Sequence, residues 1–140
     1  MKSIRHFIIA FFLLFAAATM HAQEKATAIK MYFSGWENKN WNTISKLLAD
    51  EFTFTSPNND DHISTLQFKN KCWGEAEHIR RFEFTRIVEQ GEGAYVTYRC
   101  FTKSNKTFMN TEYFTFSNGK IKSIEVFFGT GQGFPTNEKK

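Results

Sequence analysis

Aromatic and β-branched residues fall into four consecutive runs in the second half of the chain, and short segments rich in Gly, Asn and Ser separate them. Runs of this composition, bounded by turn residues, are typical of an antiparallel meander. The pattern predicts four adjacent β-strands around which the rest of the fold is organised. The predicted strands are Arg81–Glu89, Ala94–Lys103, Thr107–Phe116 and Ile121–Phe128.

The segment before these strands predicts three helices. Apolar residues recur at helical spacing within Gln23–Lys39 and again within Trp41–Ala49. A third helix is expected to begin at Ser64, because Ser64 and Gln67 have the spacing of a capping box. Gly74 is expected to end that helix.

One further strand is predicted between the second and third helices. Phe52 and Phe54 alternate with threonines over Glu51–Thr55, which indicates a short strand with one buried face. The polar residues that follow, Pro57 to Asp61, predict a loop.

Alternation along the meander assigns its two faces, and both faces carry aromatic residues. A sheet with one solvated face usually shows polar residues on that face. We therefore interpret the second face as the interface of a homodimer, against the alternative of scattered surface aromatics. The apolar residues of this outward face are Tyr95, Phe101, Met109, Tyr113 and Phe127. The inward residues are Phe82, Phe84, Val88, Val96, Tyr98, Cys100, Phe108, Asn110, Glu112, Phe114, Phe116, Ile124, Val126 and Phe128.

The first 22 residues have the layout of a secretory signal peptide. Lys2 and Arg5 precede a short apolar run over residues 7–18, and small residues follow up to Ala22. The run is too short to favour the alternative of a membrane anchor. We expect cleavage before Gln23, export to the periplasm or the medium, no membrane association afterwards, a domain over residues 23–129 and a flexible tail over residues 130–140.

Net charge and composition limit the classes of molecule that this protein is expected to bind. The formal charge of +4 falls to +2 without Lys2 and Arg5, which is too small and too evenly spread to predict nucleic-acid binding. Of the 17 phenylalanines, 13 remain without the first 22 residues, and together with Trp36, Trp41 and Trp73 they provide enough apolar volume for a full core and a lined cavity. Cys72 and Cys100 could form a disulfide in an exported protein or stay free in the core, and the sequence leaves both alternatives open.

The order of these elements resembles the nuclear transport factor 2-like superfamily, in particular its SnoaL-like domains. The stretches that carry the resemblance are Tyr32–Thr55, Asp60–Trp73 and Asn110–Gly129. The resemblance implies an α+β, cone-shaped fold, in which N-terminal helices pack into a strongly curved, mainly antiparallel sheet around an internal pocket. It also implies frequent dimerisation through the outer sheet face. Members include isomerases, dehydratases, polyketide cyclases, dehalogenases and binding domains without activity.

Three residues are candidates for acid/base chemistry. Asp61 and His62 are adjacent in the predicted loop, and a carboxylate beside an imidazole suits proton transfer. The alternative is that these residues only form a turn. Glu112 lies on the inward face, where a carboxyl must be paired, protonated or hydrated; the alternatives are a bulge that exposes it or a pair with Arg80, Arg81 or Lys103.

The pocket is expected to be mostly aromatic. Its predicted lining is Tyr32, Trp36, Phe54, Phe68, Cys72, Trp73, Tyr98, Asn110, Phe114, Val126 and Phe128. The chain has no phosphate-binding loop and no recognised metal-ligand spacing, so we expect no cofactor and no metal.

Three functions fit this sequence. The first is an exported SnoaL-like domain that binds a small apolar or aromatic molecule without converting it. The second is a cofactor-free acid/base enzyme of the isomerase, dehydratase or hydrolase type. The third is a dimeric interaction module whose pocket is filled by side chains.

Overall fold

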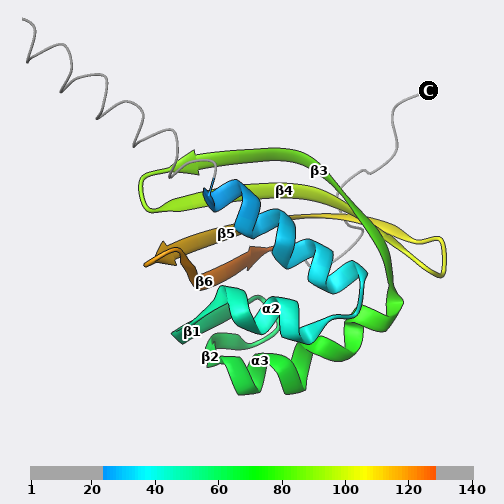
Figure 1. The fold of residues 1–140 in the computed structure, drawn as a ribbon. Helices are drawn as coiled ribbons and strands as arrows, with labels where there is room; N and C mark the ends of the chain where they lie inside the picture. The colour runs from blue at the N-terminus through cyan, green and yellow to red at the C-terminus, as the bar shows by residue number, and fades with distance from the viewer. Residues whose placement is uncertain (1–23, 129–140) are drawn as a thin grey trace, which may run out of the picture.

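The computed structural model describes residues 24–128, which form three helices on one side of a curved, open sheet (Figure 1). The first helix covers residues 24–37. The signal peptide and the tail predicted above lie outside the described residues. Within 24–128 no helix is both long enough and apolar enough to cross a membrane. The remaining elements are α2 (Trp41–Leu47), β1 (Leu48–Ser56), β2 (Asp60–Ser64), α3 (Thr65–Cys72), a 3₁₀ helix (Trp73–His78), β3 (Ile79–Gln90), β4 (Gly93–Thr102), β5 (Thr107–Ser117) and β6 (Lys120–Phe127).

The predicted meander is confirmed, and the α+β class with it. The six strands follow the order β2-β1-β6-β5-β4-β3, and β3 to β6 pair antiparallel with their neighbours in the chain. β1 lies between β2 and β6, second from one edge of the sheet, and pairs parallel with β6. The sheet is therefore mainly antiparallel, with one parallel pair that joins the N-terminal half to the meander.

The loop predicted for Pro57 to Asp61 is partly wrong, because a strand begins at Asp60. β2 pairs antiparallel with β1, with Asp60 opposite Ser56 and Ser64 opposite Thr53. Its sequence lacks a run of β-branched and aromatic residues, so the strand depends on its partner more than on its own propensity.

The helix boundaries differ from the sequence predictions at two ends. α2 ends at Leu47 instead of Ala49, because Leu48 and Ala49 are already buried in β1. The capping box at Ser64 is confirmed, with both reciprocal hydrogen bonds present. Gly74 does not end α3 in a left-handed conformation; the chain instead continues through Gly74 as the 3₁₀ helix.

The face assignment is confirmed for β4 and fails at one point of β3. Val96, Tyr98 and Cys100 are buried as predicted. A bulge between Phe84 and Arg86 shifts the register of β3, so Ile87 packs on the core and Val88 is 54% exposed. One extra residue in a strand reverses which side chains face the core.

Aromatic rings hold the helices against the concave face. Phe33 of the first helix has edge-to-face contacts with Phe82 and Tyr98 at centroid distances of 4.8 and 4.7 Å. Phe68 of α3 packs on Phe54 of β1 at 4.6 Å. Such pairs add to the stability gained from burial alone. The two clusters fix where the helices cross the sheet.

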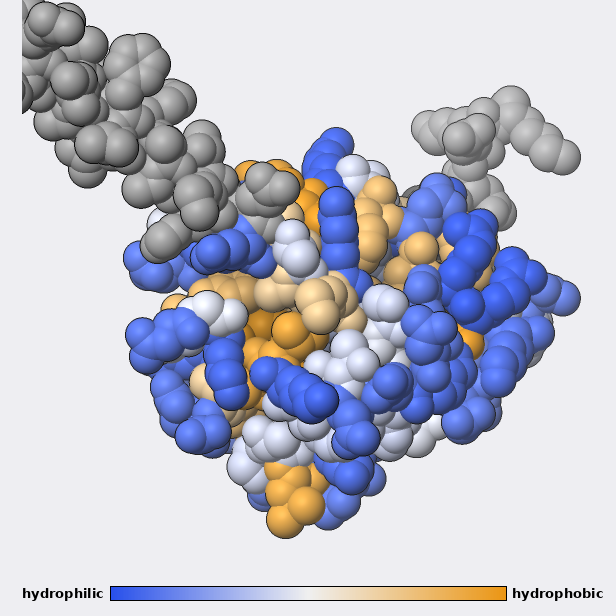
Figure 2. All heavy atoms as spheres, viewed as in Figure 1, coloured by the Kyte–Doolittle hydropathy of each residue, from blue (hydrophilic) through white to orange (hydrophobic). Residues whose placement is uncertain are grey.

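Most of the face seen in Figure 2 is polar, and apolar residues show mainly near its middle, beside the first helix.

Gly35 allows the first helix to approach α2, since a side chain at this position would collide with Ile44. Both cysteines are free: Cys100 is buried and Cys72 is half-buried.

Candidate functional site

A cavity of about 200 Å³ lies between the helices and the concave face of the sheet. Its walls come from the first helix, α3, the 3₁₀ helix and strands β1 to β6, together with residues next to them. Of the residues predicted from the sequence, ten line it: Tyr32, Trp36, Phe54, Phe68, Cys72, Tyr98, Asn110, Glu112, Val126 and Phe128.

Two predicted lining residues lie elsewhere. Phe114 is fully buried in the core, 5.5 Å from the ring of Tyr32 between centroids. Trp73 packs against Trp36 and Trp41, with ring centroids 5.1 and 5.3 Å apart and the rings inclined to each other, so it supports Trp36, which lines the cavity. Both residues belong to the aromatic core that surrounds the cavity. The periodicity of a sequence predicts that a side chain points inward, but it does not show whether this side chain borders the cavity or is covered by another ring.

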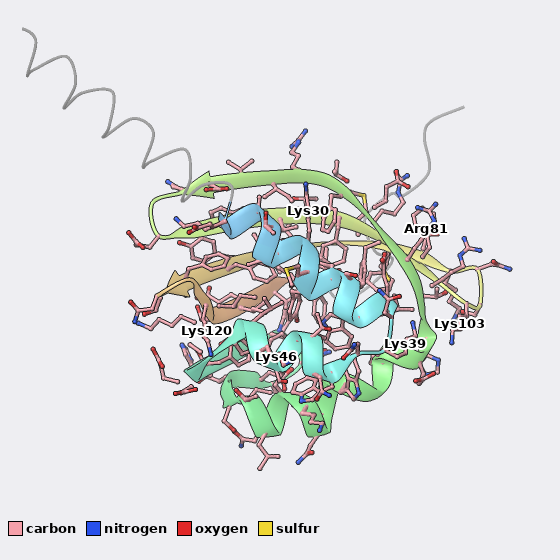
Figure 3. All side chains as sticks on the ribbon, viewed as in Figure 1. Lys30, Lys39, Lys46, Arg81, Lys103 and Lys120 are labelled. Atoms are coloured by element: carbon pink, nitrogen blue, oxygen red, sulfur yellow. The ribbon has the colours of Figure 1, made fainter. Side chains whose placement is uncertain are left out.

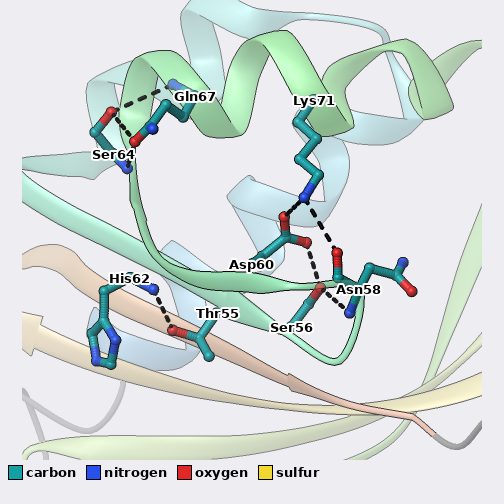
Figure 4. A network of polar contacts seen from close by, with 8 residues as sticks. All are labelled: Thr55, Ser56, Asn58, Asp60, His62, Ser64, Gln67 and Lys71. Carbon is teal, nitrogen blue, oxygen red and sulfur yellow. Dashed lines mark hydrogen bonds and ion pairs between the residues drawn. The ribbon is translucent and has the colours of Figure 1, made fainter.

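Asp61 and His62 do not join Glu112. Their side chains are 89% and 71% exposed, and neither lines the cavity. His62 Nδ1 lies 2.5 Å from Asp61 Oδ1, and the His62 backbone N–H donates to Thr55 Oγ1 (Figure 4). The predicted catalytic set of Asp61, His62 and Glu112 is therefore not assembled. Asp60 and Ile63 pair with Ser56 and Phe54, and the register shift between these pairs leaves Asp61 and His62, the latter at φ 50°, as an irregular step on the solvent side.

Asp60 is a cavity carboxyl that the predicted catalytic set left out, although the sequence places it directly before Asp61 and His62. Its side chain is 3% exposed, Oδ2 accepts a hydrogen bond of 2.5 Å from Ser56 Oγ, and Oδ1 is paired with the ammonium group of Lys71 (Figure 4). Lys71 also donates to the carbonyl oxygen of Asn58. Burial acts to raise the pKa of Asp60, but the bonds from Lys71 and Ser56 outweigh it and lower that pKa. The missing signal was β2 itself, without which the inward direction of Asp60 has no basis.

Other lining residues were absent from the predicted set, although several sat on the predicted inward face. Phe82 and Phe108 are on that face, and Phe33 neighbours a predicted residue on the first helix. The additional lining residues are Phe33, Ser56, Asn58, Asp60, Glu75, Ile79, Phe82 and Phe108.

Glu112 is the buried acid of the cavity. Its side chain is 6% exposed, and Oε1 accepts a hydrogen bond of 2.5 Å from the hydroxyl of Tyr98. Asn110 Nδ2 donates to the same hydroxyl at 3.3 Å. Oε2 is buried and has no hydrogen-bond partner. Burial raises the pKa of Glu112 to about 7, against a smaller lowering effect of the bond from Tyr98.

The groups that face Glu112 stay neutral near this pH. Burial and the nearby Glu112 raise the pKa of Tyr98 and the pKa of Tyr32 well above 10. Burial, followed by the charges of Glu37 and Glu112, raises the pKa of Cys100 to about 12. Among these close neighbours, Glu112 is the one that changes charge near neutral pH.

Strand register relates the two carboxyls. Asp60 is opposite Ser56, and Glu112 is opposite Val126. Because β1 and β6 are paired up to Thr55 and Glu125, the next position of this register sets Ser56 beside Val126. The four residues therefore form one row across four strands, with an ionised carboxylate at one end and a carboxyl of raised pKa at the other. Within the described residues, no group of His, Cys, Asp and Glu side chains is arranged to hold a metal ion.

The buried state of Glu112 predicts an unusual pH dependence of stability. The folded protein holds this proton up to about pH 7, whereas an unfolded glutamate releases it near 4.5. Between these values the unfolded state binds fewer protons, so the contribution of Glu112 to stability falls as pH rises and is constant above about 7. Relative to Glu112→Gln, the wild type should lose up to about 3 kcal/mol of unfolding free energy over this window.

Urea unfolding of both proteins, followed by circular dichroism between about pH 4.5 and 7.5, measures this difference. Groups that titrate in the same way in the wild type and in Glu112→Gln, such as Asp60, contribute equally to both unfolding free energies and cancel in their difference. A difference that does not change with pH would contradict the raised pKa of Glu112.

Comparisons with known proteins place this geometry in a family. The family profile described as a SnoaL-like domain matches residues 29–124, and no curated protein matches the chain. Among solved structures, a putative ketosteroid isomerase from Kribbella flavida superposes with a TM-score of 0.62 at 15% identity, covering 82% of this chain and 84% of that one. A putative polyketide cyclase from Sinorhizobium meliloti superposes with a TM-score of 0.58 at 17% identity, covering 72% of this chain and 94% of that one.

A protein of unknown function from Cytophaga hutchinsonii, described as NTF2-like, gives a TM-score of 0.59 at 17% identity, covering 75% of this chain and 89% of that one. At these identities the likeness shows the fold and not the activity. The predicted cone-shaped architecture and the resemblance stated from the sequence are both confirmed. The match over residues 29–124, on a curved sheet with helices packed inside it, shows that the chain belongs to the SnoaL-like domain family of NTF2-like proteins.

Proposed function

We propose that the cavity binds a small, largely apolar or aromatic molecule. The observation that carries this proposal is the partly open cavity of about 200 Å³, which has aromatic walls and a buried carboxyl oxygen, Oε2 of Glu112, left without a partner. Ligand sites usually measure roughly 300 Å³ or more. The ligand should therefore be smaller than a typical drug, about the size of one substituted aromatic ring. An interaction module with a filled interior is a poorer fit to this geometry.

Filling the cavity should abolish binding. Val126 borders the cavity beside Glu112, so Val126→Phe places a ring in the space that a ligand would occupy. Native mass spectrometry of wild-type protein purified without denaturation should show a small-molecule mass that is lost on unfolding. The same mass should be absent from Val126→Phe. The added ring should lower the free energy of unfolding by no more than about 3 kcal/mol.

Val88→Phe is the matched control, because it adds the same ring at a position that is exposed on β3. This variant should retain the ligand. A wild-type protein without any bound small molecule, or a Val126→Phe variant that keeps it, would contradict the proposed function.

A second candidate function is cofactor-free acid/base catalysis in the same cavity. Glu112 supports it, because a carboxyl with a pKa of about 7 can both accept and return a proton near neutral pH. Tyr98 would remain hydrogen-bonded to Oε1 while Oε2 exchanges the proton with the substrate. Asp60 is a weaker base, since its pKa is lowered and both of its oxygens are engaged.

This second candidate predicts proton exchange at carbon. Phenylacetone in deuterium oxide should incorporate deuterium next to its carbonyl group faster with the wild-type protein than in buffer, as followed by NMR. Glu112→Gln should lower the catalysed rate by at least about 100-fold. Glu125→Gln, which makes the same change on the outer face of β6, should not. Exchange at the buffer rate with wild-type protein would leave binding as the function.

We further propose that the protein is a homodimer through the outer sheet face formed by Tyr95, Phe101, Met109, Tyr113 and Phe127. Phe127 is 51% exposed, and the rings of Tyr95 and Tyr113 lie together with centroids 4.5 Å apart. An apolar surface of this kind on a sheet favours burial against a second copy.

Light scattering at micromolar concentration should give the mass of a dimer for the wild type and of a monomer for Phe127→Lys. Leu66→Lys is the control, because Leu66 is also exposed but lies on α3, away from the sheet. A monomeric wild-type protein would remove this part of the proposal.

We also propose export of the mature domain, on the composition of residues 1–22 alone. N-terminal sequencing of the protein from its host that still found Met1 would argue against it.

A further inference from the structure

The cavity has an unbalanced set of charged residues. Three carboxyl groups line it, from Asp60, Glu75 and Glu112, whereas none of its lining residues is Lys, Arg or His. Figure 3 labels six cationic side chains of the protein, and none of these six lines the cavity. Lys71 reaches Asp60 and neutralises it, and Glu75 is exposed at the rim. Glu112 is left as the buried carboxyl without an opposite charge.

The hydrogen bonds around Glu112 leave one of its two oxygens without a donor. Tyr98 donates its hydroxyl proton to Oε1 of Glu112 at 2.5 Å. Asn110 donates to Tyr98, so it does not reach the second oxygen of Glu112. Oε2 is buried and unpartnered on a residue that lines the cavity. A buried carboxylate oxygen without a donor is costly, and a ligand that provides a donor would remove this cost.

The walls beside this oxygen suit a positive charge. The rings of Tyr32, Phe33, Trp36, Phe82 and Tyr98 all border the cavity. Phe33 also meets Phe82 and Tyr98 edge to face, so three of these rings form one aromatic cluster in the wall. Aromatic faces attract ammonium groups, and the attraction grows when water is excluded.

We propose that the ligand of this cavity carries a protonated amine, whose N–H donates to Oε2 of Glu112 while its apolar body lies against the aromatic walls. This inference rests on the proposed binding function and specifies the chemical class of the ligand. An anion would be excluded, because the cavity offers it no cation and places it near a carboxylate. A neutral molecule of the same shape would keep the apolar contacts and lose the ion pair.

Three probes of nearly equal size separate these cases: 2-phenylethylamine, 2-phenylethanol and phenylacetate. Isothermal titration calorimetry with the full mature protein at about pH 8, where Glu112 is mostly ionised, measures their affinities. The amine should bind at least about 10-fold more tightly than the alcohol, and phenylacetate should bind most weakly.

Glu112→Gln tests the assigned partner. This variant should reduce the advantage of the amine over the alcohol to less than about 3-fold while it still binds the alcohol. Glu125→Gln, with the same loss of one carboxylate on the outer sheet face, should keep the full advantage. Repeating the wild-type titration at about pH 5.5 should also reduce the advantage, since Glu112 is then protonated and Tyr32, Tyr98 and Cys100 remain neutral at both pH values. Asp60 stays ionised through its lowered pKa, and Glu75 lies at the exposed rim.

Two results would overturn the inference and leave the proposed function standing. One is an alcohol that binds as tightly as the amine, and the other is a preference for the amine that survives in Glu112→Gln. Failure of all three probes to bind would also overturn it, and the mass measurement on Val126→Phe would then decide the binding function independently.

Discussion

The structure depends on aromatic packing between the helices and the concave face of one curved sheet. Phe33 and Phe68 each contact several rings, and together they fix the first helix and α3 over different strands. Rings in edge-to-face contact keep defined distances and angles, so they do not collapse into every available space. The cavity is the volume that remains between these two clusters.

The burial of Glu112 follows from the same constraint. β5 presents alternate residues to the concave face, which places Glu112 in line with Phe114 and Phe116. The strand cannot expose this one carboxyl without moving its neighbours to the solvent face. Tyr98, directly across from Asn110 on the paired strand, satisfies one oxygen and leaves the other without a partner, on a residue that lines the cavity. A carboxyl of raised pKa is thus held in an apolar place by the regularity of the sheet.

The parallel pairing of β1 with β6 gives the cavity its second carboxyl. Without that pairing, the N-terminal half would pack on the meander only through its helices. With it, the β1–β2 hairpin extends the sheet, and Asp60 joins the row that contains Glu112. The two acids differ in their surroundings: Asp60 has a cation and a hydroxyl as partners, whereas Glu112 has a phenol alone. Their pKa values are therefore displaced in opposite directions.

The sequence by itself determined the four strands of the meander, the capping box at Ser64 and the inward position of Glu112, because these depend on local periodicity and turn chemistry. Tertiary structure decided what local patterns do not encode. The bulge in β3 exchanged Val88 for Ile87, pairing with β1 made a strand of Asp60–Ser64, and that strand turned Asp60 inward while Asp61 and His62 faced the solvent. Strand register is set by contacts with a partner strand, and a shift of one residue reverses which side chain reaches the site.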